Sequence, residues 1–343
     1  MSDRASLDSA QSEAQDNADA TAPTTGGRRI RIPSLLGLVG LVVGLVFALF
    51  ADGYQLFVLS LMCIFGVAAI GLNISLGWTG MLVFSGSAFF GVGALVSGRL
   101  INTGLPAELS ILAAGVVGLV TAALYGAITV RLNRYYFAVT GIAIMAILHF
   151  VYQTFPAIGG GYSGFTVETP TLAVLGGAAS KTPTTLYLVG LALLALTYIA
   201  VRRLETTPLG RGWRVVRQSA STAEALGINV WRSKVISFAI SMAFVAVAGA
   251  WHVVVTARFL PESYMFTDLL FMFLILIVGG LGSINGMVLG AAFLVGVREY
   301  LRGFPGLSEL IYGVVLLAVV LFFSQGIYGA VRRKLRSLRE GVV

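Results

Sequence analysis

Nine long apolar runs constrain the fold of this chain more than any other feature. Each is about long enough to cross the roughly 30 Å hydrocarbon layer of a bilayer, which takes about 20 helical residues. Backbone polar groups must be paired inside lipid, and a helix pairs them within one segment. The sequence therefore predicts an all-α, polytopic membrane protein. The runs are 33–51, 54–75, 81–100, 106–130, 135–155, 185–202, 234–257, 266–300 and 307–328.

The run 266–300 is too long for one crossing, and Gly279 to Ser283 interrupt it after a first piece of about 14 residues. Two crossings there place 18 of the 23 Lys and Arg residues in the cytoplasm, and one crossing places 15 there. Because cytoplasmic loops carry the excess of Lys and Arg, the charge favours two crossings. We therefore expect about ten transmembrane helices, with both termini cytoplasmic.

The composition divides the chain into three parts. Residues 1–32 are rich in small, polar and acidic side chains and predict a disordered cytoplasmic tail. Residues 33–330 form the transmembrane domain, which contains a cytoplasmic loop at 203–233, and residues 331–343 form a basic cytoplasmic tail. The net charge of +8 follows from cytoplasmic Arg residues, and no basic and aromatic stripe suggests nucleic acid.

The loop carries turn and helix signals. Thr207 to Gly210 include a Pro-Leu-Gly sequence that is typical of a turn. Ser221 and Glu224 have the spacing of a capping box, and Gly227 stands where a helix commonly ends. These signals predict a helix of barely two turns. Such a helix is marginal alone, so the membrane domain or a partner's groove must hold it.

The predicted membrane interior offers little chemistry. Carboxylates fall at the ends of the apolar runs, at Asp52, Glu108, Asp268 and Glu299. A carrier coupled to protons or sodium usually needs acids at mid-depth. The sequence has no phosphate-binding loop, no cluster with metal-ligand spacing and no nucleophile and base pair. We expect no metal, no catalytic residue and no cofactor on this chain, and any energy for transport comes from another subunit.

Two glycine-rich stretches, 71–93 and 279–290, interrupt the apolar runs. One interpretation is helix packing, because Gly282, Gly286 and Gly290 form a face of small residues. The alternative is a translocation pathway, since broken backbone in a membrane is tolerated where it lines a cavity. The candidate pathway residues are Asn73, Thr79, Ser85, Ser87, Gly279, Gly280, Gly282 and Ser283.

Several of these segments resemble one family, in the expected order. GLNISLGWTGMLVFSGSAFFGVGAL and PLGRGWRVVRQSASTAEALGINVWRSKVISFAISMAFVAVAGA are similar to permease subunits of branched-chain amino acid ABC importers. RLNRYYFAVTGIAI and VGGLGSINGMVLGAAFLV add further matches. The resemblance covers about residues 35–330 and implies that 33–330 is a permease domain.

In ABC importers the cytoplasmic loop forms a coupling helix that docks in a groove of the ATPase subunit. In this sequence Ser221 replaces the acidic residue that opens the general importer pattern. By position, the resemblance places these residues in the docking element: Leu209, Gly210, Arg211, Ala223, Glu224, Ala225 and Gly227.

The resemblance implies a permease, rather than an enzyme, that passes branched-chain amino acids inward through the bacterial inner membrane. ATP and Mg would bind to two ATP-binding cassette subunits, which are its partners. A homologous second permease and an extracytoplasmic solute-binding protein complete the expected assembly. Alternatives are an ABC permease for urea or short amides, and a stand-alone secondary carrier or channel.

Overall fold

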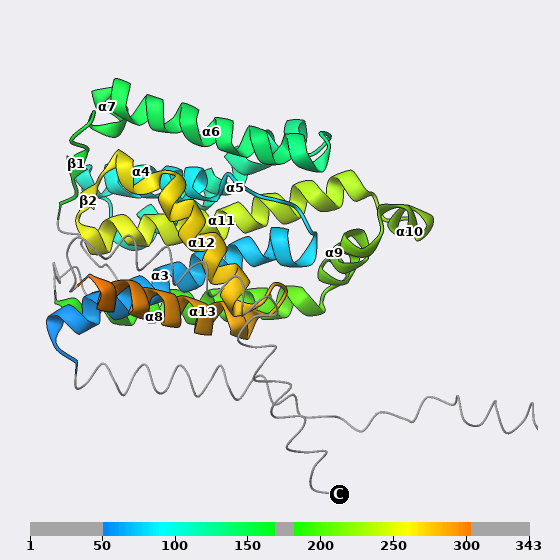
Figure 1. The fold of residues 1–343 in the computed structure, drawn as a ribbon. Helices are drawn as coiled ribbons and strands as arrows, with labels where there is room; N and C mark the ends of the chain where they lie inside the picture. The colour runs from blue at the N-terminus through cyan, green and yellow to red at the C-terminus, as the bar shows by residue number, and fades with distance from the viewer. Residues whose placement is uncertain (1–50, 169–181, 303–343) are drawn as a thin grey trace, which may run out of the picture. The chain divides into compact units, whose positions relative to one another are not determined.

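The computed structural model describes residues 51–168 and 182–302, and these form a bundle of helices (Figure 1). Within them, six helices are long and apolar enough to cross a membrane. The predicted runs 33–51 and 307–328 and both tails lie outside the described residues. The prediction of ten spans with cytoplasmic termini therefore depends on residues that are not described. The six helices are α3 continued by η1 (Gly53–Asn73 and Ile74–Trp78), α5 (Ala107–Thr129), α6 (Arg134–Thr154), α8 (Pro183–Thr206), α11 (Val230–Thr256) and α13 (Ile284–Leu301).

Helix α11 lies at the centre of the bundle and packs against α3, α4 (Gly86–Asn102) and α5. Glycines bring α4 and α11 into backbone contact. A Cβ atom at Gly93 would lie 1.9 Å from the carbonyl oxygen of Ala246, and one at Gly249 would lie 1.9 Å from that of Phe90. Small residues at a crossing let membrane helices approach closely, so packing explains these two positions.

Helices α5 and α6 are peripheral. Only 28% of the most apolar 18-residue stretch of each helix is buried, compared with 72% of the corresponding stretch of α3 and η1. Large apolar side chains such as Leu112 and Ile128 are exposed on α5. A helix that is apolar on its outer face as well as its inner one suits a membrane environment.

The first glycine-rich stretch ends α3 in a π-helix, η1, which is buried throughout. The chain then turns at Gly80, whose φ is +73°, and α4 begins only at Gly86. The predicted run 81–100 therefore starts five residues too early as a helix. The predicted break is present, and it takes the form of a π-turn followed by a non-helical segment.

The second glycine-rich stretch separates α12 (Phe266–Gly279) from α13, as the sequence predicts. Gly280 and Gly282 have φ values of +90° and +92°, which favour glycine. The two helices run antiparallel. Gly279 touches Gly286 at the turn, and Asp268 pairs with Arg298 at the far end.

Short elements cap the two ends of the bundle (Figure 1). At one end lie α9 (Pro208–Gln218) and α10 (Ala220–Ala225). At the other lie α7 (Pro156–Gly159), η3 (Pro261–Tyr264) and the antiparallel pair of β1 (Phe165–Thr166) and β2 (Arg258–Phe259). The bundle therefore presents two chemically different ends.

Candidate functional site

The polar loop between α8 and α11 folds into the two short helices α9 and α10. Thr207 is the N-cap of α9, and its hydroxyl oxygen accepts a hydrogen bond from the Gly210 N–H at 3.3 Å. Pro208 occupies the first helical position, where a missing N–H is harmless. One face of α9 is buried, and its residues are Gly210, Trp213 and Val216.

The seven predicted docking residues divide into an inner and an outer group. Gly210 and Ala223 are buried and face the rest of the protein. A Cβ atom at Gly210 would lie 2.4 Å from the carbonyl oxygen of Leu204, so glycine lets α9 pack closely on the end of α8. The exposed group forms an outward face, and its members are Leu209, Arg211, Glu224, Ala225 and Gly227.

The predicted capping box of α10 is wrong. The N-cap is Ser219, whose hydroxyl oxygen accepts from the Thr222 N–H at 3.2 Å, and Ser221 lies inside the helix. The cap moves because α9 ends at Gln218 and leaves Ser219 in an extended conformation. Glu224 then falls near the C-terminal end of α10 and is exposed, which leaves it available for a partner.

The predicted end of α10 is confirmed. Gly227 has a φ of +76°, and its N–H donates to the carbonyl oxygen of Glu224 at 2.9 Å. The N–H of Ile228 donates to the carbonyl oxygen of Ala223, also at 2.9 Å. Together these two bonds form the Schellman motif that terminates helices at glycine.

The position of the cap can be tested in solution. Ser219→Ala is expected to destabilise α10 by about 1 kcal/mol, because it removes the cap acceptor. Ser221→Ala, two residues away, is expected to change stability by less than about 0.5 kcal/mol. Hydrogen–deuterium exchange of the α10 amides measures both. Equal protection in the two variants would contradict the assignment of Ser219.

Aromatic and cationic side chains anchor α9 to the membrane helices. The Trp213 ring is fully buried and stacks on Trp78 of η1, with ring centroids 6.3 Å apart. The Arg214 guanidinium carbon lies 5.7 Å from the centroid of the Trp78 ring, and Arg214 Nη2 lies 2.6 Å from Glu205 Oε1. Buried aromatic pairs of this kind dominate local packing energies, so α9 and η1 are firmly joined.

Arg217 extends this contact to the backbone of η1. Its Nη1 atom donates a hydrogen bond to the carbonyl oxygen of Gly77. Its side chain also covers Gly80, where a Cβ atom would lie 3.2 Å from Arg217 Cγ. Sequence reasoning counted Arg217 only as a cytoplasmic charge. The available signal was its spacing of four residues from Trp213, which puts both side chains on one helix face.

Asn73 joins the two glycine-rich stretches. Its Oδ1 atom accepts a hydrogen bond from the Gly282 N–H at 2.8 Å, and its side chain is fully buried. Gly77 leaves room for this bond, because a Cβ atom there would lie 2.1 Å from Asn73 Oδ1 and 2.8 Å from Gly282 N. We name the set Asn73, Gly77, Arg217 and Gly282 the loop–membrane junction.

Hydroxyl groups connect η1 to α11 beside this junction. Thr79 Oγ1 donates to the carbonyl oxygen of Ser75 at 2.6 Å, and Ser75 Oγ donates to that of Ser237 at 3.3 Å. Ser241 Oγ donates to the carbonyl oxygen of Gly71 at 2.7 Å. The structure thus places Thr79 between packed helices, where its hydroxyl is satisfied within the protein.

The other predicted pathway residues lie in packed surroundings. Ser87 Oγ lies 3.0 Å from Met145 Sδ, and Ser85 is buried at the start of α4. Ser283 caps α13 by accepting from the Gly286 N–H at 3.1 Å. Gly279 meets the backbone of Gly286, and Gly280 forms the turn. The structure therefore places Asn73 and Gly282 in the junction and Thr79 beside it. It places the other five residues at helix starts, at helix contacts and in the turn between α12 and α13.

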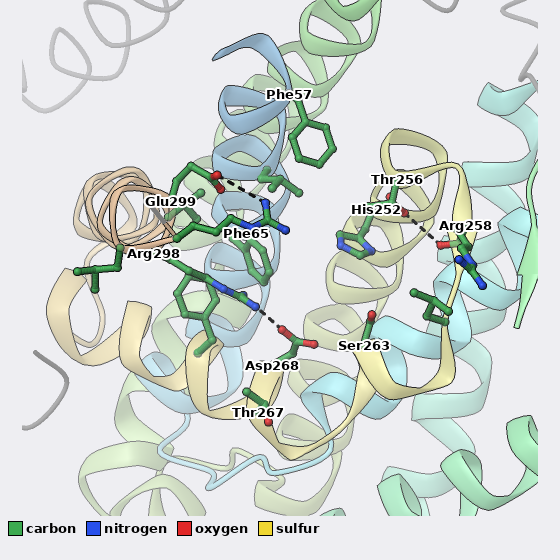
Figure 2. A pocket seen from close by; sticks show the side chains of 16 residues that line it. Phe57, Phe65, His252, Thr256, Arg258, Ser263, Thr267, Asp268, Arg298 and Glu299 are labelled. Carbon is green, nitrogen blue, oxygen red and sulfur yellow. Dashed lines mark hydrogen bonds and ion pairs between the residues drawn. The ribbon is translucent and has the colours of Figure 1, made fainter. Parts of the chain in front are cut away.

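A pocket of about 580 Å³ (Figure 2) opens at the end of the bundle opposite α9 and α10, which Figure 1 shows. Its walls come from α3, α11, α12 and α13 and from the segment between α11 and α12. None of the eight predicted pathway residues is among those that line it. Its volume lies within the range of about 300–1,000 Å³ that is usual for small-molecule sites.

Charged side chains line one side of this pocket. Arg298 Nη1 lies 3.6 Å from Asp268 Oδ1, and Arg302 Nη1 lies 3.5 Å from Glu299 Oε1. Sequence reasoning treated these two acids as the ordinary ends of apolar runs and expected a largely uncharged pathway. The antiparallel pairing of α12 and α13 brings Asp268 and Arg298 together, and no pattern along the sequence shows that. Glu299 and Arg302 lie three residues apart at the end of α13.

The membrane-length apolar helices, with the basic loop folded against one end and the pocket at the other, are the features of a polytopic helical membrane protein. The chain belongs to the family described as branched-chain amino acid transport system permease component, whose model matches residues 54–323. It is thus a transport component rather than an enzyme.

Curated relatives agree with this family. The high-affinity branched-chain amino acid transport system permease protein LivM of Salmonella typhimurium is 29% identical over 300 residues, 81% of this chain and 70% of that protein. Its Escherichia coli counterpart is 29% identical over 304 residues, 82% and 71%. The probable branched-chain amino acid transport permease protein LivM of Methanocaldococcus jannaschii is 26% identical over 234 residues, 64% and 67%. No solved structure matches the chain significantly.

Proposed function

We propose that this chain is a permease subunit of an ABC importer in the bacterial inner membrane and passes branched-chain amino acids inward. ATP and Mg bind to two ATP-binding cassette subunits, and a homologous second permease and an extracytoplasmic solute-binding protein complete the assembly. Residues 33–330 form the permease domain between the cytoplasmic tails 1–32 and 331–343. The family membership and the names of the relatives support this proposal.

One observation carries the mechanical part of the proposal. The hydrogen bond from Arg217 of α9 to the carbonyl oxygen of Gly77 ties the cytoplasmic loop to a π-helix inside the membrane bundle. On the other side of α9 and α10, Leu209, Arg211 and Glu224 are exposed. A loop that is fixed to the bundle on one face and open on the other can transmit a push from a docked partner.

In this mechanism, closure of the two ATPase subunits moves α9 and α10, and Arg217 carries the displacement to η1. Asn73 passes it to the turn at Gly282. A partner shifts the equilibrium between outward and inward openings only if it contacts the two states differently. The Arg217–Gly77 bond of the junction couples the position of α9 to η1, so the two states would present α9 differently to the partner.

The reversal of direction between α12 and α13 supports two passes of the run 266–300, which the proposed ten spans require. Helix α12 has 14 residues and is therefore about 21 Å long, shorter than the hydrocarbon layer. Its antiparallel pairing with α13 returns the chain to the pocket end. With α9 and α10 in the cytoplasm, the pocket faces the extracytoplasmic side.

Glu224→Arg is expected to uncouple uptake from ATP hydrolysis. The substitution reverses one charge on the exposed face of α10 and removes no hydrogen bond that holds the loop together. Leucine uptake by cells should fall at least about tenfold, the effect of losing roughly 1.4 kcal/mol of docking energy, while the amount of chain in the membrane stays constant.

Glu168→Arg makes the same charge change at an exposed residue just after β1, at the other end of the bundle and outside the residues that line the pocket, and should leave uptake unchanged. Quantitative immunoblotting of membranes normalises both variants. Normal uptake by Glu224→Arg would remove α10 from the docking surface. Equal losses in the two variants would show that the effect is not specific to docking.

A further inference from the structure

The pocket at the end opposite α9 has charged residues of α12 and α13 on one side, Arg258 of β2 across from them, and an apolar side (Figure 2). Its apolar side comes from α3, where Phe57, Leu61 and Phe65 follow one another at intervals of four residues. This spacing puts all three on one face of the helix. Phe271 and Val295 extend the apolar wall onto α12 and α13.

The charged side centres on Asp268 and Arg298. The separation of 3.6 Å between their nearest atoms exceeds the roughly 2.7–2.9 Å of a strong charge-assisted hydrogen bond. The Arg298 guanidinium carbon also lies 4.9 Å from the centroid of the Phe271 ring, which holds the side chain over the pocket. The pair is thus close enough to neutralise itself and loose enough to open.

Glu299 is the less available of the two acids. Its Oε1 atom accepts a hydrogen bond from the Tyr54 hydroxyl and pairs with Arg302 Nη1 at 3.5 Å. Among residues 51–168 and 182–302, Asp268 has one ion-pair partner, Arg298, at the slightly longer distance of 3.6 Å. An incoming cation would therefore meet less competition at Asp268.

His252 adds a polar atom to the same pocket. Its ring lies in the wall formed by α11, and its Nδ1 atom is buried without a hydrogen-bond partner among the described residues. A buried polar atom without a partner carries an energetic cost that a ligand can remove. His252 therefore marks the pocket as a place where a polar ligand would gain a bond.

We propose that this pocket binds the zwitterionic head group of an α-amino acid, with the carboxylate on Arg298, the ammonium on Asp268 and the side chain against Phe57, Leu61 and Phe65. The inference rests on the proposed function and extends it to the recognition of the solute. His252 Nδ1 contributes a hydrogen bond to the head group.

The charge arithmetic favours a zwitterion over other small solutes. When it enters, Arg298 exchanges one carboxylate for another and Asp268 exchanges a guanidinium for an ammonium. Neither member of the Asp268–Arg298 pair is left without a counter-ion, and the largely buried Asp268 carboxylate, 15% exposed, keeps a cationic partner. Urea or a short amide carries no charge with which to replace either partner, so it would gain less from the Asp268–Arg298 pair than a zwitterion does. The apolar wall then selects among amino acids for a hydrophobic side chain.

Three related probes test this directly. Saturation-transfer NMR on the full-length chain in lipid nanodiscs measures the binding of L-leucine, of leucinamide, which lacks the carboxylate, and of 4-methylpentanoate, which lacks the ammonium. Leucine is expected to bind at least about tenfold more tightly than either analogue, since each analogue loses one charged hydrogen bond. Equal binding of all three, or no binding of leucine, would overturn the proposal.

Two variants assign the contacts. Arg298→Gln should weaken leucine binding to the level of leucinamide, and Asp268→Asn should weaken it to the level of 4-methylpentanoate. Arg298→Lys, which keeps the charge, should retain part of the affinity. Arg232→Gln, at the other end of α11, serves as the control for an exposed arginine. If a variant remains monodisperse but its binding of leucine, leucinamide and 4-methylpentanoate is weakened equally, the residue has a structural role and the assignment is overturned.

These experiments distinguish failure of the proposed binding pocket from failure of the proposed importer function. If leucine binds through Arg298 and Asp268 but ATP does not drive its uptake, the proposed importer fails and the pocket stands. If ATP drives leucine uptake with the same concentration dependence in both variants, the importer stands and the pocket is not its recognition site.

Discussion

Gly77→Ala is expected to abolish most transport while the chain still inserts in the membrane. The new Cβ atom would lie 2.1 Å from Asn73 Oδ1 and 2.8 Å from Gly282 N. The Asn73 side chain must move, and the Gly282 N–H loses its acceptor. An unsatisfied donor of this kind costs about 1–3 kcal/mol, and the loop–membrane junction loses its central bond. Uptake into cells or proteoliposomes measures the effect.

A double-mutant cycle separates this mechanism from general damage. In an Asn73→Ala background the clashing oxygen is absent, so Gly77→Ala should cost less than it does in the wild type, by about 0.5–3 kcal/mol of coupling. Gly212→Ala provides the control, because its Cβ atom would lie 3.7 Å from Ile228 Cδ1, an ordinary contact. Additive losses from Gly77→Ala and Asn73→Ala would contradict the role given to their contact.

Gly93→Ala is expected to prevent stable folding. Its Cβ atom would lie 1.9 Å from the carbonyl oxygen of Ala246, so α4 and α11 must separate along their whole crossing. Overpacking a tight interface costs about 3 kcal/mol at the upper end of the usual range. Gly249→Ala introduces the same clash with Phe90 from the opposite helix. The thermal unfolding midpoint in detergent and the yield of monodisperse protein measure both.

The two substitutions should be strongly non-additive. Once one has pushed α4 and α11 apart, the second meets less resistance, since both act on the same crossing. Gly296→Ala on α13 is the matched control, with Met62 Cε at 3.5 Å and no need for movement. A Gly93→Ala variant as stable as Gly296→Ala would show that the α4–α11 contact adapts at low cost.

The large features of the described fold could be predicted because the bilayer imposes them. Length and apolar content identified α3, α5, α6, α8 and α11, since lipid leaves few other structures possible. The break between α12 and α13 was also predictable, because Gly280 and Gly282 adopt φ values that favour glycine. These inferences depend on single residues or local composition.

The contacts of the junction could not be predicted from the sequence. Arg217 and Gly77 are 140 positions apart, and Asn73 and Gly282 are 209 apart. The pattern of a single chain has no signal for such pairings. The local rules for capping also failed at Ser221, because the end of α9 at Gln218 decides where α10 begins.

The acids of the pocket escaped prediction for a related reason. The positions of Asp268 and Glu299 within their apolar runs indicate only that both residues lie near helix ends. Whether such a residue faces lipid headgroups or a pocket depends on which neighbour its helix meets. The pairing of α12 with α13 decides this, and it turns Asp268 toward Arg298.

Helix α3 and its π-turn form one element of 26 residues from Gly53 to Trp78. Tyr54 and Phe57 near its beginning belong to the pocket end, and Gly77 near its end accepts the bond from Arg217. The pocket end and the α9 end of the permease thus both contact the same continuous helix, Gly53–Trp78. In the proposed importer, thermodynamic reciprocity then requires that any change in the nucleotide affinity of the ATPase subunits caused by solute in the pocket be matched by an equal change in solute affinity caused by bound nucleotide.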